Sequence, residues 1–151
     1  MIHVRAVLPA DRAAWQPLWD GYNAFYGRAG DTALPAAVTE TTWGRFFDPA
    51  EPVYALVAEG ANGALLGLVH YLFHRSTTRI EPTCYLQDLF TTPEARGRGV
   101  GRALIEAVDA AARAAGVKRV YWQTHTTNIT ARALYDRVAQ HQGFLIYAQD
   151  V

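Results

Sequence analysis

The residues of this chain best suited to binding an anion lie in the stretch PEARGRGVGRALIEAV, residues 93–108. Glycines alternate with arginines there, at the start of a segment whose apolar residues recur at helical spacing. A helix start carries unpaired amides and the positive end of the peptide dipoles, and glycine lets the backbone curl until several amides point at one anion. The arginines add mobile positive charge. The set suits a diphosphate group and consists of Arg96, Gly97, Arg98, Gly99, Val100, Gly101 and Arg102.

Two nucleotide-binding motifs do not fit this loop. A dinucleotide fingerprint G-x-G-x-x-G that begins at Gly97 needs glycine where Arg102 stands, and one that begins at Gly99 needs it where Leu104 stands. A Walker loop needs Gly-Lys followed by Ser or Thr, which this stretch lacks. On these residues alone, the glycines fit a phosphate cradle, a nucleic-acid contact or a solvated turn.

The composition limits the possible partners. Basic and acidic residues number 14 each, so no overall field draws the chain to nucleic acid or to an anionic membrane. Cys84 is the only cysteine, which excludes an internal disulfide and a multi-cysteine zinc site. The N-terminal residues lack the long apolar stretch of a signal peptide or membrane span. We therefore expect a cytoplasmic protein with neither a nucleic acid nor a membrane as partner.

The elements that must position the loop follow from residue periodicity. Strands are expected over 2–8, 53–59, 64–76, 83–92, 117–124 and 144–151. Helices are expected from Asp11 as N-cap to residue 25, with a kink or late start at Pro17, and over 36–47, 101–115 and 128–141. The turn residues GANG at 60–63 join two strands as a hairpin.

This order of elements predicts the fold class. Early hairpins imply antiparallel pairing, whereas the helix between strands 83–92 and 117–124 implies a parallel crossover. We expect one α/β (α+β) domain over residues 1–151, with a mixed, largely antiparallel central sheet and helices on both faces.

Two ordered motifs carry a resemblance to a known family. LFTTPEARGRGVGRALI, at 89–105, resembles the acyl-CoA-binding motif of the GCN5-related N-acetyltransferases (GNAT), with Arg96, Gly99 and Gly101 as its core. NITARALYDRVAQHQGFLIY, at 128–147, resembles the closing helix and strand of that family, and the order of elements agrees over essentially the whole chain. The resemblance implies a GNAT-like fold and acetyl-CoA as cosubstrate.

The same resemblance implies where coenzyme A lies. Its pantetheine arm is expected to bond like an added strand beside main-chain groups near Leu89, Phe90 and Thr91, with the diphosphate on the amides of residues 96–102. A main-chain amide near Leu89 or Phe90 is a candidate to polarise the thioester carbonyl. Asn128 begins the following helix and fits an N-cap, a cofactor contact or both, and Ala131 is a further expected contact.

The proton transfers need an acid and a base. Tyr135 matches the tyrosine that protonates the leaving thiolate in many members, although it also falls on the apolar side of its helix, where packing alone would explain it. Relatives that acetylate polyamines carry Glu in YLEDL-like strands where this chain has Gln87, which cannot take a proton. His125 is the first candidate base because histidine titrates near neutral pH, and Glu81, Asp88 and water remain alternatives.

The histidine pair of one expected strand does not indicate a metal site. His70 and His74 lack a third ligand at suitable spacing, so we expect partial exposure on a strand face and no metal. We assign catalysis to neither histidine.

The expected function is transfer of an acetyl group from acetyl-CoA to a primary amine. The acceptor is either a small amine such as a polyamine or an amine on a protein. Gln87 leaves an alternative open, a non-catalytic acyl-CoA-binding or regulatory module. A homodimer through the terminal strand at 144–151 is a further expectation from the resemblance.

Overall fold

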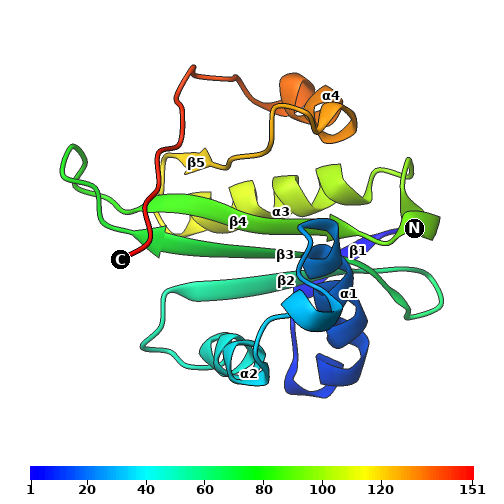
Figure 1. Ribbon diagram of the computed structural model, residues 1–151. Helices are drawn as coiled ribbons and strands as arrows, with labels where there is room; N and C mark the ends of the chain where they lie inside the picture. Colours follow the sequence, from blue (N-terminus) through cyan, green and yellow to red (C-terminus); the bar gives the residue numbers. More distant parts are fainter.

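The structure is a computed structural model that describes residues 1–151, and it is built around one five-stranded sheet. Its strands lie in the order β1-β2-β3-β4-β5 (Figure 1). They are β1 (His3–Ala6), β2 (Val53–Glu59), β3 (Leu65–His74), β4 (Thr83–Thr91) and β5 (Val120–Tyr121). The first four pair antiparallel, and β5 pairs parallel to β4. The expected mixed, largely antiparallel sheet is thereby confirmed.

Helices pack on both faces of the sheet. They are α1 (Arg12–Phe25), α2 (Ala36–Arg45), α3 (Val100–Ala114) and α4 (Ile129–Val138), with short 3-10 turns η1 (Pro9–Asp11), η2 (Gly30–Thr32) and η3 (Pro93–Ala95). Strand alternation divides the core: on β3, Leu68 packs with the α1 side chains and Val69 packs with those of α3. Trp15 is the largest fully buried side chain of the α1 cluster, against which Trp43 and Phe46 pack from α2 and its end. No helix is long and apolar enough to cross a membrane.

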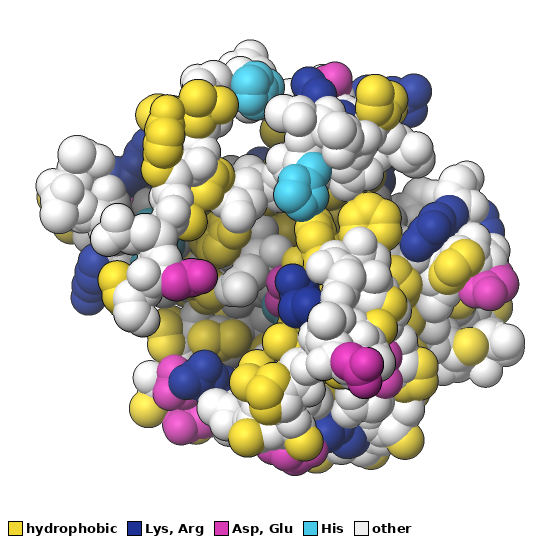
Figure 2. Space-filling view, viewed as in Figure 1, with side chains coloured by type: hydrophobic (Ala, Val, Ile, Leu, Met, Phe, Trp, Pro, Cys, Tyr) yellow, Lys and Arg dark blue, Asp and Glu magenta, His cyan; other side chains and the backbone are white.

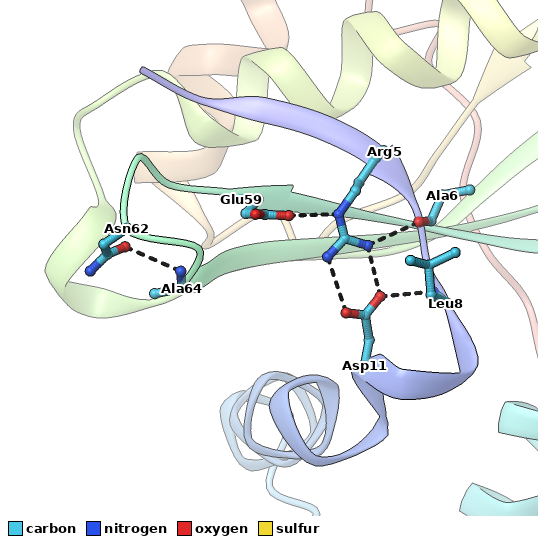
Figure 3. A network of polar contacts seen from close by, with 7 residues as sticks. All are labelled: Arg5, Ala6, Leu8, Asp11, Glu59, Asn62 and Ala64. Carbon is cyan, nitrogen blue, oxygen red and sulfur yellow. Dashed lines mark hydrogen bonds and ion pairs between the residues drawn. The ribbon is translucent and has the colours of Figure 1, made fainter.

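A charged network fixes where α1 begins (Figure 3). Arg5 on β1 bonds Glu59 on β2 through Nε at 2.6 Å and Asp11 through its terminal nitrogens at 2.8 and 3.0 Å. Asp11 also accepts a hydrogen bond from the amide of Leu8 at 2.7 Å. Asp11 occupies the N-cap position as expected, but its side chain makes no cap hydrogen bond. Helix α1 starts at Arg12, so the late start expected at Pro17 is wrong.

The C-terminal part differs most from the sequence expectation. Strand β5 covers only two of the eight residues expected, α4 ends at Val138, and no strand forms over 144–151. Side chains there have strand character but are exposed, with Phe144 at 79% and Tyr147 at 90%. A strand needs a hydrogen-bonding neighbour, and intrinsic preference does not replace one. The expected closing strand is therefore wrong for the single chain.

Candidate active site

Strand β4 has an open edge along its second half. It pairs with β5 only at Cys84 and Tyr85, whereas its pairing with β3 continues to Thr91. Within that ladder Leu86 faces Tyr71 and Asp88 faces His70, so Gln87 has no opposite residue and forms a bulge. From Leu86 to Thr91, main-chain groups on one side of β4 therefore lack a strand partner.

The ladder identifies which amides point to that edge. The amide of Thr92 donates to the carbonyl of Leu66 at 2.9 Å. In an antiparallel pair the direction alternates, so the amide of Phe90 also points to β3, while those of Leu89 and Thr91 point to the open edge. Of the three expected main-chain contacts, Leu89 and Thr91 have amides available to a ligand.

The glycine loop lies at the end of this edge and offers free amides. Gly97 and Gly99 have φ of +76° and +83°, the left-handed conformation that glycine adopts without strain. No amide from residues 97 to 102 donates to a main-chain carbonyl, and the first such bond of α3 runs from Ala103 to Gly99 at 3.0 Å. The loop thus presents several donors at one helix start, as an anion site requires.

The side chains around these donors fit the same ligand. Arg96 donates from Nε to the carbonyl of Thr91 at 3.3 Å, and Arg98 is exposed without an ion-pair partner. Arg102 bonds Glu106 at 2.9 Å on the exposed face of α3. A Cβ on Gly101 would lie 3.4 Å from Leu134 on α4, which explains a small residue at this approach of the two helices.

Tyr135 lies between α4 and the residues after β5. It is half-buried, and its ring meets that of Trp122 edge-on with centroids 5.5 Å apart. Burial, and then the neighbouring Tyr26, raises the pKa of Tyr135 to about 12. The phenol therefore holds its proton throughout the neutral range, as a proton donor must.

The other expected residues of α4 flank the same region. Asn128 is the N-cap residue of α4, but its side chain donates to Thr124 at 3.0 Å instead of capping the helix. Ala131 is half-buried one turn before Tyr135.

The candidate bases occupy different surroundings. His125 is exposed, and its ring centroid lies 6.0 Å from that of Tyr26. Glu81 precedes β4 and pairs with Arg79 at 3.7 Å. Asp88, only 8% exposed, faces α1, whereas Gln87 is exposed.

A buried polar chain behind Asp88 was not expected from the sequence. His70 is 3% exposed, so the expected partial exposure is wrong for it, while His74 is half-buried as expected. Trp15 Nε1 donates to His70 Nε2 at 3.1 Å, and His70 Nδ1 lies 2.9 Å from Asp88 Oδ2. Because Nε2 accepts, the neutral ring carries its proton on Nδ1 and donates it to Asp88. Only the pairing of β3 with β4 brings these residues together, and no sequence motif signals it.

The face above β4 is hollowed. Figure 2 shows this hollow between the C-terminal segment and the loop that follows α1, with basic, acidic and histidine side chains at its edge. Tyr22 packs beneath that loop and donates from its hydroxyl to the carbonyl of Gln87 at 3.4 Å. This face of β4 is therefore accessible from outside at the hollow.

Comparison with known proteins gives a consistent result. A model of the acetyltransferase (GNAT) family matches residues 15–139. The D-amino-acid N-acetyltransferase HPA3 of Saccharomyces cerevisiae is 37% identical over 150 residues, which are 99% of this chain and 91% of that protein.

Solved structures share the fold. A ribosomal-protein-alanine N-acetyltransferase from Brucella melitensis aligns with a TM-score of 0.78 at 16% identity, over 100% of both chains. An aminoglycoside acetyltransferase from an uncultured soil metagenomic sample aligns with a TM-score of 0.80 at 17% identity, over 99% of this chain and 97% of the other.

Proposed function

The chain belongs to the acetyltransferase (GNAT) family, and from this premise we propose that it transfers the acetyl group of acetyl-CoA to the primary amine of a small molecule. The observation that carries the proposal is the row of amides from residues 97 to 102 that lack main-chain acceptors, at the end of the open edge of β4. A carrier without a phosphate group would not need such a site, whereas coenzyme A supplies both an anion and an extended arm.

Coenzyme A binds, in this proposal, along the second half of β4. The loop at 96–102 receives the diphosphate, and the pantetheine arm pairs with main-chain groups of Leu89 and Thr91. Asn128 and Ala131 contact the cosubstrate from α4. The amide of Leu89 donates to the thioester oxygen, which becomes negative as the amine attacks.

The reaction proceeds by direct attack. The amine nitrogen forms a bond with the thioester carbon, and the carbon–sulfur bond then breaks to release the thiolate. Tyr135 gives its proton to that sulfur and regains, through water, the proton that the nitrogen loses on becoming an amide. Its raised pKa keeps the proton available at neutral pH.

We propose His125 as the group that removes the proton of the acceptor ammonium, because its imidazole is exposed beside Tyr26. Asp88 is the second candidate. It lies at the β4 bulge, where the open edge begins, and accepts a hydrogen bond from His70.

The acceptor is a small amine in this proposal, and HPA3 supports an amino acid among small amines, because that relative is named for D-amino acids. Polyamines and amines on proteins are the alternatives that the assay must include.

The proposal is tested by measuring thiol release from acetyl-CoA across a panel of amino acids, polyamines and peptides. We expect acceptor-dependent release with at least one small amine. With that amine, His125→Gln should lower kcat most at the higher pH values, where the wild type reaches its full rate. The rise of kcat with pH on the acidic side should therefore be flatter in the variant than in the wild type. An unchanged profile in His125→Gln together with a flattened one in Asp88→Asn would assign the base to Asp88.

A result without turnover would contradict the proposal. Calorimetric binding of acetyl-CoA with no release in the presence of any amine would identify instead an acyl-CoA-binding module, which the exposed Gln87 favours over an enzyme with a strand carboxylate.

A further inference from the structure

Arg28, in the loop that follows α1, is held in place from behind. Its Nε donates to Oδ1 of Asn23 at 2.7 Å, and Asn23 is itself buried and bonded to the carbonyl of Trp19 at 2.9 Å. The guanidinium carbon lies 5.4 Å from the ring centroid of Tyr26 and 5.9 Å from that of Tyr22. These contacts fix a flexible side chain against two aromatic faces.

Arg28 nevertheless has no counter-ion. Some arginines of the chain pair with carboxylates, such as Arg5 with Asp11 and Arg12 with Glu40, but no carboxylate lies within 4.0 Å of Arg28. Its terminal nitrogens donate to no protein acceptor. A positioned guanidinium with free donors has the geometry that binds a carboxylate through two parallel hydrogen bonds.

Asp88 supplies the opposite charge at the bulge of β4. One carboxylate oxygen, Oδ2, accepts the hydrogen bond from His70 at 2.9 Å. The other, Oδ1, makes no hydrogen bond within 3.5 Å and is not fully buried, although the Tyr22 hydroxyl is near enough to the carboxylate to interact with it. His70 therefore orients a carboxylate that keeps one oxygen for a ligand.

Tyr22 interacts with both charges. Its ring lies beside Arg28, and its hydroxyl reaches the carbonyl of Gln87, the residue before Asp88. Burial, and then the charge of Asp88, raises the pKa of Tyr22 above its usual range, while Arg28 acts in the opposite direction. The Tyr22 phenol is therefore influenced by both charges, on the face of β4 that packs against α1.

We propose that the acceptor is a free amino acid held by both of its charges, with its carboxylate on the guanidinium of Arg28 and its ammonium group on Oδ1 of Asp88. This inference rests on the proposed function and deepens it. A polyamine would bring a second positive charge toward Arg28, and an internal peptide amine has no carboxylate to offer there.

The test compares alanine and phenylalanine, as both enantiomers, with the corresponding amino-acid amides and with spermidine. The amides keep the ammonium group and remove only the carboxylate charge. We expect the wild type to use at least one amino acid with kcat/KM about 10- to 100-fold above that of its amide, the effect of a charge-assisted pair. Arg28→Gln should abolish this difference by raising KM for the amino acid while leaving the amide unchanged.

Arg45→Gln is the matched control, because Arg45 is exposed and its ion pair with Glu51 is long, at 3.9 Å. It should behave as the wild type with every acceptor. Asp88→Asn should lower kcat/KM for amino acids and for their amides alike, since both carry the ammonium group.

Binding separates this inference from the proposed function. Calorimetry of the same amino acids with the protein saturated by coenzyme A should show binding that Arg28→Gln weakens by a similar factor, whether or not turnover occurs. Equal kcat/KM for amino acids and their amides in the wild type, or binding that does not depend on Arg28, would overturn the inference. Thiol release with other amines would in that case still support the proposed acetyltransferase activity. Arg28-dependent binding of amino acids without thiol release from any amine would support the inference and contradict the proposed acetyltransferase activity.

Discussion

At the scale of single residues, the neighbours of a side chain decide its role. Tyr135 packs on Trp122 and is half-buried, and this burial raises its pKa to about 12. Packing and proton donation are therefore compatible, since desolvation favours the neutral phenol. Asp88 and His70 show the same dependence, because each owes its buried hydrogen bond to the strand opposite.

Tyr135→Phe should lower kcat about 100-fold, the typical contribution of a positioned proton donor, with little change in the KM for acetyl-CoA. The variant keeps the ring that packs on Trp122, so its thermal unfolding should match that of the wild type. Steady-state kinetics with the best amine of the panel measures the effect. Tyr54→Phe, on β2, is the control, and an equal loss there or full activity in Tyr135→Phe would contradict the assignment.

The raised pKa adds an expectation about pH. The neutral phenol is the favoured form in the folded protein, so Tyr135 stays protonated as pH rises past 10 and loses its proton only near 12. Wild-type kcat should show no alkaline loss from this group between about pH 7 and 10.

At the scale of elements, the site depends on how β4 ends and α3 begins. The bulge at Gln87 and the loss of pairing with β5 free one edge of the strand. Left-handed glycines then turn the chain so that α3 starts with its amides free at the end of that edge. A strand edge and a helix start together have the features that binding an extended anionic carrier requires.

Gly99→Asp should weaken coenzyme A binding at least 10-fold in calorimetry. A Cβ there meets nothing within 4 Å, so the loss comes from the left-handed φ of +83° and from a negative charge placed among the phosphate donors. Gly116→Asp is the control at the other end of α3, because its φ of +77° and open surroundings are the same. Unchanged affinity in folded Gly99→Asp would reject the cradle.

At the scale of the whole molecule, the sheet brings the proposed cosubstrate side and the proposed acceptor side to the same stretch of β4. Helix α3 and α4 hold the cradle and Tyr135, whereas α1 and the loop after it hold Tyr22 and Arg28 (Figure 1). The C-terminal residues form no strand or helix. They run past β5 as an extended segment with four consecutive exposed apolar side chains, Phe144, Leu145, Ile146 and Tyr147.

We propose that a second copy of the chain covers this segment. Light scattering coupled to gel filtration should then give the mass of a dimer, and Ile146→Asp should shift it to a monomer by charging the apolar row. Val38→Asp charges an exposed apolar residue on α2 and should leave the mass unchanged. A monomeric wild type at assay concentrations would exclude this arrangement.

The sequence by itself determined the local features. Gly97 and Gly99 predicted the turn before α3, and the change from a helical period to alternation located three of the four longer strands and α3 almost to the residue. Such features depend on contacts within a few residues, and spacing along the chain records them.

Only the tertiary structure decided the rest. The pairing of His70 with Asp88, the contact of Tyr22 with the carbonyl of Gln87 and the missing strand at 144–151 all depend on which distant segments meet. Ladder register and helix docking set those meetings through the packing of the whole core, to which every element contributes. The sequence therefore determines which functional group stands at each position, and the fold determines which of these groups become neighbours.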